Sequence, residues 1–72
     1  MNREPKFKPG QGVVVVNVRS ASAVGYLGVP MHIEDYVKNP NLLRVTKDGE
    51  YLYPCTSDNG YFSWWYEDEL KS

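Results

Sequence analysis

The sequence predicts an all-β fold, a small five-stranded barrel with a short C-terminal helical turn. Short runs of β-branched and aromatic residues follow one another along the 72-residue chain. Gly, Pro, Asn and Asp separate these runs, and no stretch repeats apolar residues at the spacing of an amphipathic helix. Closing so many short strands into a barrel would remove the sheet edges that promote aggregation.

The chain is long enough for one hydrophobic core and not two, so residues 1–72 are expected to form a single domain. Residues 1–12 are rich in Pro and Lys and are interpreted as an N-terminal arm, with Phe7 as an anchor. The predicted strands cover residues 13–18, 29–37, 42–46, 51–53 and 61–66. In the second of them, Met31 and Ile33 share one face with Val29.

Turn signals separate the predicted strands. Residues 19–28 hold several small side chains and predict an irregular loop. Asp48-Gly49 predicts a type I′ hairpin turn, which needs positive φ at both central positions. Pro54 is expected to end the fourth strand and to leave Cys55 in a loop. Residues 67–70 are expected to form the closing helical turn.

Composition argues against several classes of function. The net charge is −1 and the isoelectric point is about 5.7, so the basic surplus of a protein that binds duplex DNA strongly is missing. The longest apolar run, residues 13–16, is too short to cross a membrane. A lone cysteine that has no disulfide partner favours a reducing, cytoplasmic location.

Catalytic and metal-binding arrangements are weakly represented. His32 lies near Glu34 and Asp35, but zinc usually takes three or four ligands that include His or Cys, and the chain has one of each. A nucleophilic pair of Cys55 and His32 would need the base held within hydrogen-bond reach and a third, orienting group, and nothing in the local sequence supports that arrangement. We therefore predict no enzymatic activity, no metal and no cofactor.

The predicted fifth strand carries two alternating sets of aromatic residues. Ten of the 72 residues are aromatic, more than so small a core can enclose. Residues 62, 64 and 66 share one face of this strand, and residues 61, 63 and 65 share the other. One tryptophan is therefore expected in the core and the other at the surface.

The order of several short motifs resembles that of small bacterial and phage SH3-like barrel proteins. These motifs are Phe7-Lys8-Pro9-Gly10, the valines at 13–16, Gly25-Tyr26-Leu27-Gly28, Asp48-Gly49 and the segment from Trp64 to Leu70. The resemblance implies an SH3-like barrel and a phage-encoded protein that binds and modulates a host protein. It also implies that Trp65 points outward together with Tyr61.

The resemblance bears on the first strand as well. Asn17 shares a face with Val13 and Val15, which argues that Val14, Val16 and Val18 point inward. The family pattern implies the reverse, and a β-bulge near Val16 or Asn17 would reconcile the two readings. In both readings at least one valine faces outward, so self-association is a further expectation.

We therefore expect a non-enzymatic protein–protein interaction module. Exposed aromatic residues bury a large area at little rotamer cost, and neighbouring carboxylates steer a basic partner. The predicted partner-binding residues are Tyr61, Trp65, Glu67, Asp68 and Glu69. Two alternatives remain: a nucleic-acid-associated barrel that stacks bases on Tyr and Trp, and an accessory subunit of a larger enzyme complex.

Overall fold

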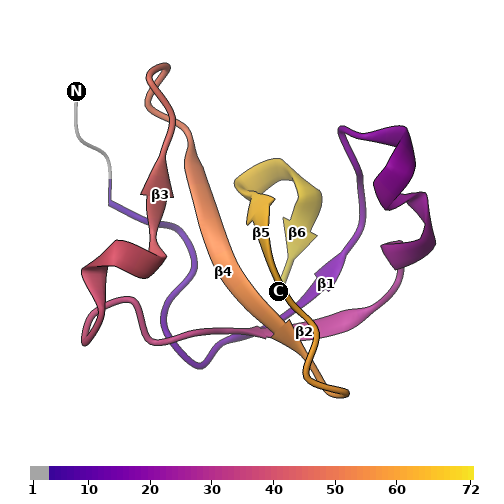
Figure 1. Cartoon of the computed structure of the whole chain (residues 1–72), viewed down its shortest axis with the longest axis horizontal. Helices are drawn as coiled ribbons and strands as arrows, with labels where there is room; N and C mark the ends of the chain where they lie inside the picture. The colour runs from indigo at the N-terminus through magenta and orange to yellow at the C-terminus, as the bar shows by residue number, and fades with distance from the viewer. Residues whose placement is uncertain (1–3) are drawn as a thin grey trace.

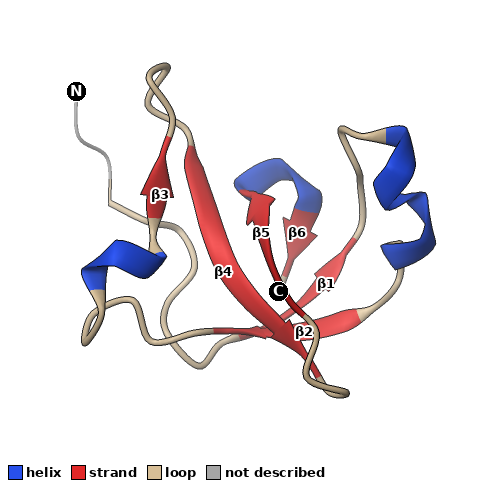
Figure 2. Ribbon diagram, in the orientation of Figure 1, coloured by secondary structure: helices blue, strands red, loops and turns tan. Residues whose placement is uncertain are grey.

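Six strands pair into one antiparallel sheet in the computed structural model, which describes residues 4–72 (Figures 1 and 2). The strands are β1 (Gly12–Val15), β2 (Pro30–Ile33), β3 (Arg44–Val45), β4 (Tyr51–Ser57), β5 (Phe62–Tyr66) and β6 (Leu70–Lys71). Short 3-10 helices connect them: η1 (Ala21–Tyr26), η2 (Pro40–Leu42) and η3 (Glu67–Glu69). The all-β prediction is confirmed, and η3 is the predicted closing turn.

The sheet is open rather than closed. Its strands follow the order β5–β4–β2–β1–β6, and β3 lies beside the first part of β4. Within residues 4–72 no pairing joins β5 to β6; Figure 1 shows η3 arching between these two ends of the sheet. The structure therefore has six strands where the sequence predicts five, and the predicted closed barrel is not confirmed.

The register of β1 follows the family pattern. Val13 and Val15 are buried, whereas Val14 and Val16 are 36% and 49% exposed. The argument from Asn17 fails because β1 ends at Val15, before alternation reaches that residue. The amides of Val16 and Asn17 both donate to the carbonyl of Glu69, which is the hydrogen-bond pattern of the expected bulge.

The hydrophobic core includes Phe7, which lies before the first strand. Phe7 is 1% exposed and packs edge-on against Tyr53, so the predicted anchor is confirmed. The Tyr53 hydroxyl accepts a hydrogen bond from the amide of Lys6 and donates one to Glu67, each at 2.8 Å. The buried hydrophobic residues are Phe7, Val13, Val15, Met31, Ile33, Tyr36, Tyr53, Cys55, Trp65 and Leu70.

Three local predictions are corrected. Residues 19–28 contain the helix η1, whose first turn is capped when Ser20 accepts a hydrogen bond from the amide of Ser22. The hairpin at Asp48-Gly49 is present. Of its two central residues only Gly49 has a positive φ (+85°), because every residue with positive φ among residues 4–72 is a glycine. Its amide donates to the Thr46 carbonyl, which makes a three-residue loop and not a type I′ turn.

Pro54 lies inside β4 and does not end it. Its carbonyl accepts a hydrogen bond from the amide of Glu34, so its main chain points away from β5. On the edge of β4 opposite β5, β3 pairs with Tyr51 and Leu52, and β2 pairs with residues 55–57. Pro54 lies between these two paired segments. The missing N–H therefore removes no ladder hydrogen bond, and the strand continues through the proline.

Candidate functional site

The two tryptophans of β5 face opposite sides, in the reverse of the predicted sense. Trp65 is 4% exposed, whereas Trp64 is only partly buried and Phe62 is 38% exposed. The prediction that Trp65 points outward is wrong because Trp65 pairs directly with Tyr53 of β4. Directly opposed residues share a face of the sheet, so Trp65 follows the fully buried Tyr53 into the core.

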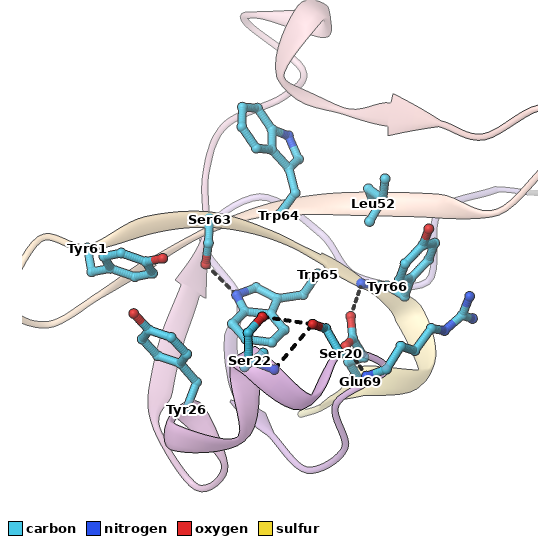
Figure 3. A pocket seen from close by; sticks show the side chains of 12 residues that line it. Ser20, Ser22, Tyr26, Leu52, Tyr61, Ser63, Trp64, Trp65, Tyr66 and Glu69 are labelled. Atoms are coloured by element: carbon cyan, nitrogen blue, oxygen red, sulfur yellow. Dashed lines mark hydrogen bonds between the residues drawn. The ribbon is translucent and has the colours of Figure 1, made fainter.

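Tyr61 is at the surface, as predicted, with 44% exposure. Its ring stacks on that of Tyr26 from η1, with centroids 4.9 Å apart, and Tyr26 meets Trp65 edge-on at 5.8 Å. Figure 3 shows these three rings together beneath β5. Sequence reasoning treated Tyr26 only as part of a Gly-rich motif and missed its role, because that role depends on how η1 folds back over the strand.

The acidic residues after β5 do not form one surface. Glu69 is 5% exposed, and its two carboxylate oxygens accept hydrogen bonds from the amides of Tyr66 (2.8 Å) and Arg19 (2.9 Å). Glu69 therefore does not lie at the surface, where the prediction placed it; its carboxylate serves main-chain donors that would otherwise be unpaired. Glu67 is partly buried and accepts the Tyr53 hydroxyl, whereas Asp68 is exposed.

Arg19 forms ion pairs with two acids, Asp68 and Glu50, near the end of β5. One guanidinium nitrogen lies 2.9 Å from a carboxylate oxygen of Asp68 and 2.7 Å from one of Glu50. The guanidinium carbon lies 3.8 Å from the centroid of the Tyr66 ring. Hydrogen bonds with Asp68 and Glu50 raise the pKa of Arg19 above its ordinary value, so the cluster always contains a cation.

An open pocket of about 320 Å³ lies between η1 and β5 (Figure 3). Of the predicted binding residues it brings together Tyr61, Trp65 and Glu69. Asp68 and Glu67 instead line a neighbouring hollow of about 260 Å³, which Arg19 shares with the first. We call the larger pocket, together with the side of β5 that borders it, the η1–β5 groove.

Trp64 forms the outer rim of this groove and is held in place from three sides. Its indole N–H donates to the carbonyl of Leu42 in η2 at 2.7 Å. The guanidinium of Arg44 lies 3.7 Å from its ring centroid, and Phe62 meets it edge-on at 4.7 Å. This side chain is therefore a preorganised wall that loses little freedom when a ligand binds.

The residues considered for metal binding and for nucleophilic chemistry do not lie together in one site. Within residues 4–72 no group of three or more His, Cys, Asp or Glu side chains is placed to hold a metal ion. His32 lies 2.9 Å from Glu34 on the outer face of β2. Cys55 is fully buried on the opposite face of β4, so the two side chains cannot form a nucleophile–base pair.

Burial also sets the reactivity of Cys55. Removal from water, together with the charge of Glu34, raises the pKa of the thiol to about 12. We expect maleimide or iodoacetamide to leave the folded protein unlabelled at pH 8 and to modify Cys55 rapidly in denaturant, since the thiolate is the reactive form. Mass spectrometry of timed samples measures both rates. Equal labelling rates in the two conditions would show that β4 does not cover this residue.

Comparison of the chain with protein-family models, with curated proteins and with solved structures finds no match. In the part of the chain that the structure describes, no helix is both long enough and apolar enough to span a membrane.

Proposed function

We propose that this chain is a non-enzymatic protein-interaction module whose partner binds in the η1–β5 groove. The observation that carries the proposal is the lining of this groove. Tyr61 and the partly buried Trp64 line it at the start of and along β5, and Tyr26 of η1 stacks on Tyr61. Aromatic residues on a preorganised surface are the usual energetic centre of protein interfaces.

The proposal keeps part of the predicted binding set and replaces part of it. Tyr61 stays as a contact residue of the groove, and Glu67 and Asp68 stay as contact residues in the neighbouring acidic hollow. Trp64 takes the place of Trp65, and Glu69 becomes a support for the groove. We also retain the SH3-like assignment as a proposal. It is supported by a β1 strand that pairs with both β2 and β6, and by the 3-10 turn that joins β5 to β6.

Two further expectations rest on sequence alone. The motif order that resembles phage and bacterial SH3-like proteins is the ground for proposing a phage-encoded modulator of a host protein. A single cysteine, buried and free, is the ground for proposing a cytoplasmic location.

One feature is shared with surfaces that bind nucleic acids: two arginines lie beside aromatic rings of β5. Arg44 lies over Trp64, and Arg19 lies over Tyr66. These guanidinium groups occupy ring faces on which bases would stack, and Arg19 is already paired with carboxylates. The same contacts therefore favour a protein ligand that packs against the edges of the rings.

The proposal predicts that Tyr61→Ala weakens partner binding by about 2 kcal/mol, or roughly 30-fold in Kd, while the domain stays folded. Val45→Ala is the matched control, because Val45 is also exposed (58%) but lies on β3, outside the groove. Affinity capture with the full chain and with both variants identifies the partner, and calorimetric titration of the purified partner measures each Kd. Equal affinities for Tyr61→Ala and the unaltered chain would place the binding surface elsewhere.

A further inference from the structure

We infer that the partner enters the η1–β5 groove as an extended peptide that adds an antiparallel strand to the free edge of β5. This inference rests on the proposed function and specifies the chemistry of its ligand. Its basis is the set of main-chain groups that β5 leaves unpaired, together with the charges at the two ends of this strand.

One edge of β5 is fully used by β4. The amide of Ser57 donates to the carbonyl of Tyr61 at 2.9 Å, so the main chain of Tyr61 points toward β4. Pointing direction alternates along a strand, so Ser63 and Trp65 also face β4, where they oppose Cys55 and Tyr53.

Phe62, Trp64 and Tyr66 therefore point their main-chain groups away from β4, toward the groove. Two contacts support this assignment independently. Trp64 opposes Pro54, whose carbonyl is turned away from β5 toward Glu34. The amide of Tyr66 leaves the sheet and donates to the carboxylate of Glu69.

Glu69 thus satisfies one outward amide of this edge and leaves the others open. The N–H and C=O groups of Phe62 and Trp64 have no hydrogen-bond partner among residues 4–72. Those four groups are spaced as in an antiparallel ladder, where two alternate residues of an added strand can pair with all of them. Natural proteins usually block such an edge with charge, proline or a covering segment, so an open one beside a pocket indicates strand addition.

The walls of the groove define the side chains that this strand carries. Residues of an added strand alternate between the two faces of the sheet. One set lies against Tyr26 and Tyr61 on the η1 side, and the other lies against Phe62 and Trp64 on the outer side. Aromatic rings stand on both walls, beside the small side chains of η1, so the peptide has apolar residues at the paired positions and at the positions between them.

Charge places a basic residue of the peptide at one end of the groove. At the Tyr66 end, the carboxylates of Glu50 and Asp68 contact the single guanidinium of Arg19, and Glu67 lines the same hollow, so three acids stand against one cation. No lysine or arginine lines the groove at its Tyr61 end. An antiparallel strand begins beside Tyr66, so a Lys or Arg of the peptide lies on the N-terminal side of its paired residues. The partner is thus a protein with an extended apolar segment that follows a basic residue.

The first test uses a randomised library of linear peptides, selected against the full chain and then synthesised with a fluorophore for anisotropy titration. We expect the selected sequences to carry a basic residue before an apolar stretch. N-methylation of the peptide at the two alternate paired residues is expected to raise Kd about tenfold, and N-methylation between them much less. A uniform effect along the peptide would overturn strand addition.

The second test uses two variants that differ in one main-chain donor. Phe62→Ala and Phe62→Pro both remove the ring, but only the proline removes the outward N–H, at a strand start where proline is tolerated. We expect Phe62→Pro to bind the selected peptide about tenfold more weakly than Phe62→Ala. Equal Kd values for the two folded variants would contradict the inference.

A measurement on the unaltered chain covers the case in which Phe62→Pro does not fold. The amides of Phe62 and Trp64 should exchange rapidly with deuterium in the free protein and slow by at least about tenfold with the peptide bound. Binding that depends on Tyr61 without this protection would keep the proposed function and refute strand addition. Peptide binding that is indifferent to Tyr61→Ala would refute the groove itself. Protection of Trp64 in a dimer, without peptide, would identify a second copy as the occupant and overturn the inference.

Discussion

Trp65→Ala is expected to lower the free energy of unfolding by about 3–5 kcal/mol, the usual cost of truncating a buried aromatic side chain. Trp65 is 4% exposed, pairs with the buried Tyr53 and meets Tyr26 edge-on. Its loss leaves a cavity under β5 and removes the ring on which η1 rests. A domain of this size has only a few kcal/mol in reserve, so the variant should be largely unfolded at 37 °C.

Trp64→Ala is the matched control, since it removes the same side chain from the adjacent position. Trp64 is only partly buried and has one hydrogen bond, to Leu42, so its loss should cost about 1–2 kcal/mol. Urea titration of both variants, followed by far-ultraviolet circular dichroism, compares the two costs. A larger loss for Trp64→Ala than for Trp65→Ala would mean that the register of β5 is inverted.

Glu69→Ala is expected to cost about 3 kcal/mol, although the residue carries a charge and lies in a three-residue helix. Its carboxylate accepts two main-chain hydrogen bonds, from Tyr66 and Arg19, and bonds to a charged acceptor contribute about 1.5–3 kcal/mol each. Removing it leaves two amides without an acceptor, one at the end of β5 and one at the entry to η1.

Asp68→Ala provides the control, because Asp68 is the neighbouring acid but its side chain is 57% exposed. Its ion pair with Arg19 should contribute less than about 1 kcal/mol. Glu69→Gln keeps the shape and one oxygen acceptor, so it should recover part of the stability lost in Glu69→Ala. Chemical denaturation of the three variants decides the question. A Glu69→Ala variant as stable as Asp68→Ala would show that the two hydrogen bonds do not stabilise the fold.

Alternation along single strands was the part of the fold that sequence reasoning predicted well. The inward positions of Met31 and Ile33 follow from period two, and the existence of two opposed aromatic sets on β5 follows from the same rule. The prediction of Phe7 as an anchor is also confirmed, because a large apolar side chain in a polar segment is stabilised by burial in the core.

The wrong predictions concern features that depend on contacts between elements far apart in the sequence. Which face of β5 turns inward depends on its register against β4, and a single strand does not contain that information. Pro54 is accommodated only because β2 and β3 leave space beside it. The sequence predicts Glu69 at the surface, because it does not show that the amide of Arg19, fifty residues earlier, donates to this carboxylate.

The pairing of β1 with both β2 and β6 has a consequence for the rate at which the domain folds. β4 and β5 meet across a tight turn, and such hairpins form within microseconds. Val14, however, pairs with Lys71, so that contact closes a loop of nearly the whole chain before its own few hydrogen bonds are gained. Topologies dominated by such distant pairings fold in milliseconds to seconds. We therefore expect docking of β6 on β1 to be a late event, and the open side of the nascent sheet to stay exposed until it occurs.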